Sequence, residues 1–184
     1  PIVQLGIGII KNTDLKFRFV PQQKSNSVTF QMFGIGLMHD IKQHIPGLKR
    51  LPFDLSILAA YNTVSGTASL VSTSGVISTD GSLGYKLNSW VAQAIISKKV
   101  SVLTAYAGVG YGSVSSNVDI TGSFVVPATV GSFTVKDPLA LGLSNNSARL
   151  TAGLRLKLGP VYINGDYTLQ KYNALTVGFG FAVR

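Results

Sequence analysis

The chain has 184 residues, no cysteine and a net charge of +9, from sixteen Lys and Arg against seven acidic residues that are all Asp. Its mean hydropathy is +0.33 and only 12% of its residues are charged, which is low for a water-soluble domain. The length allows one domain with a sizeable interior. The lack of Cys and of any apolar run of about eighteen residues excludes disulfides, thiolate chemistry and transmembrane helices.

Apolar and polar residues that alternate one by one predict strands, because successive side chains of a strand point to opposite faces. In the first half of the chain this pattern covers residues 2–10, 15–20, 28–37 and 53–61. Residues 38–52 lose the pattern, and Pro46-Gly47 precede two basic residues, Lys49-Arg50. We expect a short helical turn and a basic bend there.

In the second half, the same alternation predicts strands at residues 85–96, 100–112, 148–158, 161–170 and 174–183. About nine strands are therefore predicted. Residues 62–84, which are rich in Ser, Thr and Gly, and residues 113–147 predict two long loops. The other connections are short, such as the turn at Gly159-Pro160.

The strand at residues 148–158 indicates the fold class. Its even-numbered residues are Ala and Leu, whereas Arg149, Arg155 and Lys157 lie on the opposite face. Strands of about ten residues with one apolar face, joined alternately by tight and long connections, are typical of outer-membrane barrels. Aromatic residues toward the strand ends resemble the girdles of such barrels: Phe17, Phe19, Tyr61, Trp90, Tyr111, Tyr167 and Phe181. The sequence thus predicts an all-β, antiparallel transmembrane β-barrel.

We expect one domain over residues 1–184, with outer loops at 62–84 and 113–147 and a periplasmic bend at 38–52. Bacterial barrels have an even number of strands, so nine strands predict that one or more N-terminal strands lie outside this chain. The alternative is a soluble sandwich or lipocalin-like barrel, whose strands also alternate but turn their apolar face inward.

Two stretches carry a resemblance to a known group of proteins. The first is Phe33-Gly34-Ile35-Gly36-Leu37-Met38-His39-Asp40-Ile41, followed by Pro46 and Leu51-Pro52-Phe53-Asp54-Leu55; the second is Val177-Gly178-Phe179-Gly180-Phe181. The first resembles Bacteroidota outer-membrane β-barrels of unknown function, and the second is similar to the last strand of many such barrels. The chain departs from the pattern by ending on Ala182-Val183-Arg184 rather than on an aromatic residue. The resemblance implies a fold and a location, and no activity.

The basic residues within strands are the main candidate site. On the lipid face of a barrel each charge would cost about 2–4 kcal/mol at mid-depth, so these side chains are expected to point into the lumen. The predicted pore-lining residues are Lys16, Arg18, Arg149, Arg155 and Lys157, with Asp166 as a local partner. They form either a buried network with Asp166 and tyrosines such as Tyr162, or a positive constriction that favours anions.

A second candidate is the segment from Val118 to Leu143, which is unusually apolar for a loop. Phe124, Val126, Leu139 and Leu141 would be exposed if it were unstructured, and exposed apolar clusters usually indicate a contact. Three interpretations stay open: a lid over the barrel mouth, strands that continue beyond the membrane, or a docking site for a partner.

Other chemistry has little support in the sequence. The spacing of His39 and His44 places them poorly on one helical face, and a metal site needs three or four ligands. The G-x-G pairs open no helix, so we interpret them as strand positions that leave space for larger neighbours. No catalytic triad, recognition helix or stacking platform is indicated, so we expect neither an enzyme nor a nucleic-acid partner, and no cofactor or metal.

The leading expectation is a bacterial outer-membrane channel, or passive transporter of small solutes, with a basic lumen. Its partners would be the lipid bilayer and, in a second hypothesis, other envelope proteins around a non-conducting barrel. A weaker hypothesis is the uptake of hydrophobic molecules through the apolar outer segment.

Overall fold

A computed structural model describes residues 2–9, 12–25, 27–46, 51–70, 77–78, 81–127, 132–136 and 139–182. Nine antiparallel strands form one sheet: β1 (Val3–Gly8), β2 (Thr13–Ser25), β3 (Val28–Asp40), β4 (Asp54–Ser69), β6 (Ser82–Val100), β7 (Leu103–Thr121), β10 (Leu139–Leu158), β11 (Val161–Leu169) and β12 (Ala174–Phe181). A smaller sheet contains β5 (Ile77–Ser78), β8 (Ser123–Pro127) and β9 (Ser132–Lys136). No helix in these ranges is long and apolar enough to cross a membrane.

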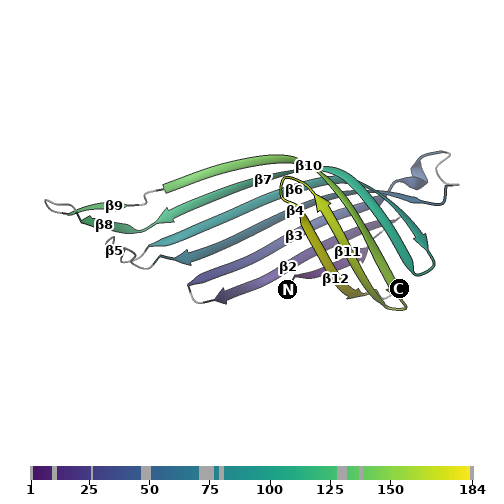
Figure 1. Ribbon diagram of the computed structural model, residues 1–184, viewed down its shortest axis with the longest axis horizontal. Coiled ribbons are helices and arrows are strands. Elements are labelled where there is room, and N and C mark those ends of the chain that lie inside the picture. The colour runs from purple at the N-terminus through teal and green to yellow at the C-terminus, as the bar shows by residue number, and fades with distance from the viewer. Residues whose placement is uncertain are drawn as a thin grey trace.

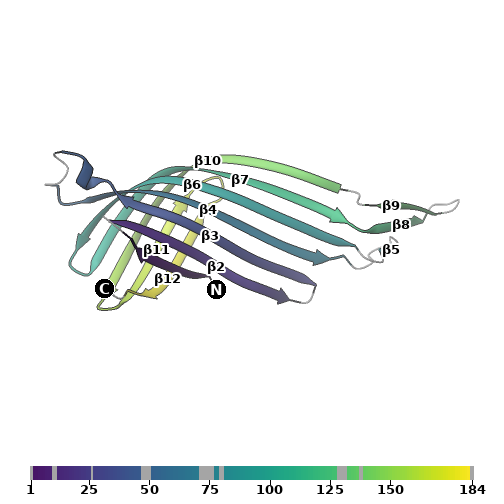
Figure 2. The ribbon, with the colours of Figure 1, turned by 180° about the vertical axis from the view of Figure 1, so that it is seen from behind.

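The large sheet curls into a half-barrel (Figure 1). Each strand pairs with the next in the order β1-β2-β3-β4-β6-β7-β10-β11-β12, and β11 and β12 bend round toward the viewer in Figure 1 and lie behind the other strands in Figure 2. Within the described residues, β1 and β12 are each paired on one side only. The all-β, antiparallel prediction and its nine strands are confirmed.

The two predicted long loops are largely wrong, because the strands on either side continue into them. β4 runs to Ser69 and β6 begins at Ser82, so much of residues 62–84 is strand. β7 likewise runs to Thr121 and β10 begins at Leu139, and the β8–β9 hairpin lies between them. The physical reason is that the alternation of side chains does not stop at these borders but changes its phase.

One irregularity interrupts the regular pairing on β2. The register shifts between Val20 and Gln23, so Pro21 and Gln22 form a bulge opposite β3. Proline has no N–H to donate to a ladder, and a bulge is one of the few places within a sheet that accepts it.

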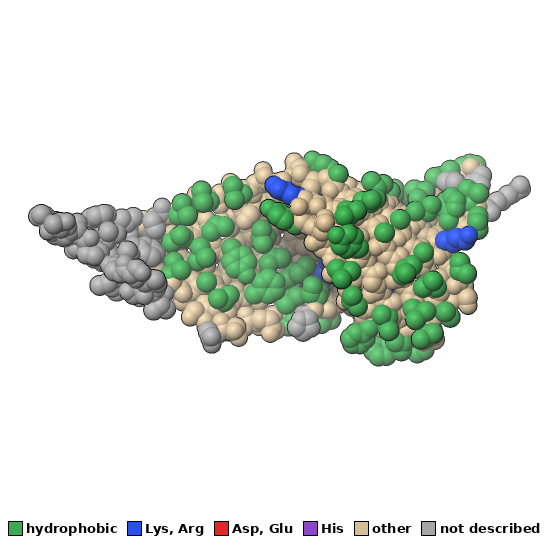
Figure 3. Space-filling view, viewed as in Figure 1, with side chains coloured by type: hydrophobic (Ala, Val, Ile, Leu, Met, Phe, Trp, Pro, Cys, Tyr) green, Lys and Arg blue, Asp and Glu red, His purple; other side chains and the backbone are tan. Residues whose placement is uncertain are grey.

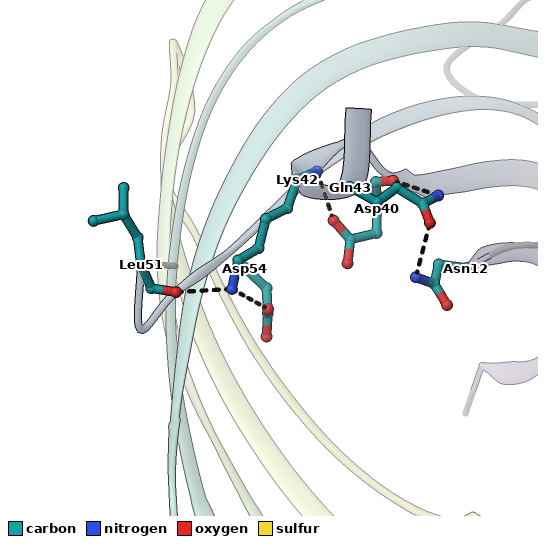
Figure 4. Close-up of polar contacts among 6 residues, drawn as sticks. All are labelled: Asn12, Asp40, Lys42, Gln43, Leu51 and Asp54. Carbon is teal, nitrogen blue, oxygen red and sulfur yellow. Dashed lines mark hydrogen bonds and ion pairs between the residues drawn. The ribbon is translucent and has the colours of Figure 1, made fainter. Parts of the chain in front are cut away.

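The expected bend between β3 and β4 is present, and it contains the 3-10 helix η1 (Lys42–His44). Lys42 holds it in place: its backbone N–H donates to Asp40 Oδ1 at 2.9 Å, and its Nζ donates to the Leu51 carbonyl at 2.8 Å and to Asp54 Oδ1 at 3.4 Å (Figure 4). Lys49 and Arg50, which the sequence places in this bend, lie outside the described residues.

The two faces of the sheet differ in what they expose. Lys16 and Arg18 on β2 line the same cavity of about 180 Å³ as Arg149 on β10, although four strands separate β2 from β10 in the sheet. The sheet therefore curls around these side chains, and we call their face the inner face. In the described residues Val20 is the one buried hydrophobic side chain, at 5% exposure, while large apolar residues of the outer face are exposed. The soluble alternative expects the apolar face of these strands inside, whereas in this curled sheet that face is the outer one.

Candidate functional site: a basic cluster below an apolar inner face

The outer face of the sheet changes from polar to apolar along the strands. Starting from the β8–β9 end, one row across the sheet reads Gly142, Asn117, Lys86, Ser65 and Gln31. A row farther along reads Ala148, Tyr111, Ala92, Ala59, Leu37, Leu15 and Ile7. The border between the two regions crosses the middle of the four longest strands.

Aromatic side chains lie at this border. Trp90 is paired with Tyr61 across β4 and β6, and its ring centroid lies 6.0 Å from that of Tyr111 on β7. All three side chains are on the outer face and about half exposed. The aromatic residues predicted from the sequence thus include a group of neighbours in the sheet, placed where the outer surface changes character.

The inner face has the opposite order. We call residues 28–32 of β3, 62–69 of β4, 82–89 of β6, 113–121 of β7 and 139–147 of β10 the extension. Two rows across its inner face are apolar throughout apart from one glycine: Leu139, Ile120, Leu83, Ala68 and Val28, and then Leu141, Val118, Tyr85, Gly66 and Phe30. Hydrophobic side chains cover this face in Figure 3, beside a hollow in which a basic side chain is visible.

The phase of the alternation therefore inverts between the two parts of the sheet. On β7, Val109 and Tyr111 point outward, whereas Val114, Val118 and Ile120 point inward. The structure thus assigns Leu139 and Leu141 to a continuous strand, which was one of the three interpretations of the apolar segment. Phe124 and Val126 belong to β8, but their side chains lie outside what the structure describes.

The predicted basic residues meet on the inner face next to the extension. We call Lys16, Arg18, Arg149 and Arg155 the basic cluster. The positive charge of Lys16 interacts with that of Arg155, and the charge of Arg18 with that of Arg149, in both cases across the curled sheet. Lys16, Arg18 and Arg149 therefore line one cavity from two distant strands, and Arg155 lies near enough for its charge to act on Lys16.

No ion pair neutralises this cluster within the described residues, where the one salt bridge is Lys42–Asp54. Arg18 Nη2 donates to Gln4 Oε1 at 3.1 Å, and Lys16 Nζ lies 3.3 Å from Met38 Sδ. The Arg155 guanidinium lies 5.1 Å from the ring centre of Tyr162, which is a cation–π contact. Neutral groups thus make the direct contacts of Lys16, Arg18 and Arg155. Asp14 acts on Lys16, and Asp166 on Arg149, through charge without forming a salt bridge.

Arg149 is the least satisfied member of the cluster. Its Nη2 donates to Thr168 Oγ1 at 3.4 Å, and Thr168 Oγ1 also lies 3.0 Å from Thr151 Oγ1. Its Nε is a buried N–H without a hydrogen-bond partner among the described residues. Buried polar groups are normally paired, so this N–H is an exception among the described residues.

Asp166 and Lys157 have different surroundings from those expected. Asp166 Oδ1 accepts hydrogen bonds from Tyr106 Oη at 2.9 Å and Asn164 Nδ2 at 3.4 Å, and forms no salt bridge with the cluster. Lys157 lies on the inner face opposite Tyr162, farther toward the β10–β11 turn. Tyr106 was not among the residues predicted from the sequence, although its position between Ala105 and Ala107 in the alternation would have placed it inside.

The two histidines are closer than their spacing suggested. His39 is the last residue but one of β3, and His44 ends η1, which turns back on the strand and brings the two Nε2 atoms to 3.1 Å. His39 Nδ1 lies 2.8 Å from Thr13 Oγ1. No group of three or more His, Cys, Asp or Glu side chains is arranged as metal ligands in the described ranges.

A family profile matches nearly the whole chain. It covers residues 1–183 and is described as a family of unknown function (DUF6588). The chain belongs to this family. Comparison with curated proteins gives no significant match.

Proposed function

We propose that this DUF6588 chain forms the wall of a membrane-spanning β-barrel in a bacterial outer membrane, of the Bacteroidota kind that its sequence resembles, and that its basic lumen passes small anionic solutes. The observation that carries the proposal is the outer face, which is apolar over one band and polar beyond it. A folded chain in water would hide such a band, because large exposed apolar patches are unfavourable.

The height of the apolar band fits a bilayer. On β10 the outward residues Ala148 to Leu158 are uniformly Ala or Leu. Ten residue steps at about 3.3 Å give a strand length of about 33 Å. A tilt of about 40° reduces this to about 25 Å, the usual height of the apolar band of outer-membrane barrels.

The aromatic border supports the same placement. Tyr and Trp prefer the boundary between lipid and water, since their rings are apolar and their O–H and N–H groups are polar. Tyr61, Trp90 and Tyr111 lie together at the border between the apolar band and the polar outer face of the extension. In this placement the extension and the β5–β8–β9 sheet stand outside the membrane.

The basic cluster supports anionic solutes. Rings of basic side chains favour anions in pores, because the field of several like charges is strong where lipid and protein exclude water. The cluster has no carboxylate in salt-bridge contact among the described residues, and Arg149 Nε has no acceptor there. Of the two interpretations that the sequence allowed, the geometry favours the positive constriction over a neutralised network.

Single-channel recording of the intact protein in a planar bilayer under a salt gradient tests the proposal. We expect discrete current steps and a reversal potential that indicates anion preference. Arg149→Glu should shift this potential toward cation preference. Lys171→Glu, which makes the same charge change in the exposed β11–β12 connection, should leave it unchanged.

Equal reversal potentials for the wild type and Arg149→Glu would refute the role of the cluster. Electrical silence, from protein shown to be folded by its heat-modifiable migration on gels, would favour the alternative of a non-conducting barrel within a larger envelope complex.

A further inference from the structure

We infer that the inner face of the extension binds the hydrocarbon chain of an amphipathic anion, a long-chain carboxylate, whose head group is held by the basic cluster. The inference rests on the proposed function and names its substrate class. It starts from the inverted polarity of the extension, whose outer face is polar and whose inner face carries Leu141, Tyr85 and Phe30 in one row.

The inner face of the extension is a packed apolar surface that stays partly exposed. A Cβ atom on Gly66 would meet the Thr29 carbonyl oxygen and the hydroxyl end of the Tyr85 side chain, so that end of Tyr85 lies over the glycine. Leu139, Leu141 and Leu143 nevertheless remain 38%, 48% and 65% exposed. An apolar surface that stays exposed on the inside of a sheet, while the outside is polar, is suited to an apolar occupant.

Charge decides which apolar occupant fits. The inner face changes from apolar to basic over the six residues from Leu143 to Arg149 on β10, a distance of about 20 Å at 3.3 Å per residue. Arg149, Arg18 and Lys16 line one cavity at this end, and among the described residues the buried Nε–H of Arg149 has no hydrogen-bond partner. A ligand that follows the face from one end to the other must have an extended apolar part and one anionic end, as a long-chain carboxylate does.

The probe for the test is a palmitate analogue that carries a photoreactive diazirine at the end of its chain. The intact protein is irradiated with it in lipid nanodiscs, and mass spectrometry locates the cross-links. We expect cross-links on inner-face residues of β3, β6 and β10 in the extension. Excess palmitate should compete, whereas acetate and hexadecanol should compete far less.

Matched variants on β10 separate the two faces. Leu141→Gln, on the inner face, should lower the cross-linking yield about tenfold, because it removes apolar contact area. Ala140→Gln, its neighbour on the outer face, should leave the yield unchanged. Arg149→Gln should weaken competition by palmitate and leave that by hexadecanol unaltered, since only the carboxylate is held by a charge.

Three results would overturn the inference. Cross-links confined to the outer apolar band would mean that the probe merely dissolves in lipid around the barrel. Equal yields from the Leu141 and Ala140 variants would mean that the inner face does not bind the chain. Absent cross-links together with destabilisation by Leu141→Gln alone would mean that other parts of the protein cover this face. Current recordings test the proposed channel separately. Anion-selective current without cross-linking would support the channel and refute only the long-chain carboxylate as its substrate.

Discussion

The placement of the apolar band predicts a large effect of one charge on the outer face. Leu154 lies on β10 near the middle of the band and is 53% exposed. In lipid, Leu154→Arg should destabilise the folded protein by about 2–4 kcal/mol, the cost of Arg near the midplane of a barrel. This corresponds to a factor of about 30 to 1,000 in the folding equilibrium, at about 1.4 kcal/mol per factor of ten. In water, the same change at an exposed site would alter stability by no more than about 0.5 kcal/mol.

The assay is guanidinium unfolding of the intact protein in lipid vesicles, followed by tryptophan fluorescence and by gel migration. Ser144→Arg is the matched control, because Ser144 lies on the same strand and the same face but in the polar extension. We expect its free energy of unfolding to stay within about 0.5 kcal/mol of the wild type.

Equal free energies of unfolding for the two arginine variants would refute this reasoning. Such a result would mean that Leu154 and Ser144 both face water or both face lipid, and it would refute the proposal of a membrane-spanning wall.

Three further predictions concern stability and use the same unfolding assay. Gly110→Ala should lower the free energy of unfolding by about 1–3 kcal/mol, because its Cβ would meet a backbone carbonyl of the neighbouring strand. Gly6→Ala has open space around its Cβ and should be neutral or slightly stabilising, and equal effects of the two variants would contradict the close approach at Gly110. Thr151→Val should lower the free energy of unfolding by about 1–2 kcal/mol, since it leaves the hydroxyl of Thr168 (4% exposed) with a poorer partner. The double variant with Thr168→Val should lose less than the sum of the two single variants, and strict additivity would argue against that hydrogen bond. Lys42→Met should lower stability by about 1–2 kcal/mol through loss of its two Nζ hydrogen bonds in the bend, and an unchanged unfolding midpoint would show that the bend is held otherwise.

Much of the fold could be predicted because the barrel strands alternate in one phase. In residues 148–158 every even-numbered residue is Ala or Leu, so strand, face and neighbours follow directly from the order of the residues. The basic residues could be assigned to the inner face for the same reason. That the basic residues of β2 and β10 lie close together across the sheet could not be predicted. Their distance depends on how tightly the sheet curls, which the alternation does not specify.

The extension was foreseen only as one of three interpretations of residues 118–143, and the predicted strands stopped short of it for a reason that the structure makes clear. Leu139, Leu141 and Leu143 alternate as well as the barrel residues do, but on the odd-numbered positions. A search for one continuous apolar face ends where the phase changes, and the residues beyond that point then resemble a loop. A change of phase without a break in alternation was therefore the available signal.

The contact between His39 and His44 was missed for a different reason. Helical spacing was applied to residues that lie on two elements, a strand and a 3-10 helix that turns back on it. Sequence separation within one element says little about distance once the chain reverses.

In the proposed membrane placement, the border of polarity across β4, β6, β7 and β10 also fixes how deeply the protein sits in a bilayer. Sinking by one row would bring the serine and asparagine side chains of the outer extension into hydrocarbon, and rising by one row would bring apolar side chains such as Ala148 and Leu37 into water. The height of the apolar band therefore matches one thickness of the hydrocarbon core of the bilayer. A hydrocarbon core of about 30 Å exceeds its band of about 25 Å, so such a bilayer must thin around the barrel, at a cost of a fraction of a kcal/mol for each Å of mismatch. In that placement the protein is best matched to a membrane as thin as the bacterial outer membrane, and the hydrophobic thickness of the host bilayer becomes a variable that sets its stability.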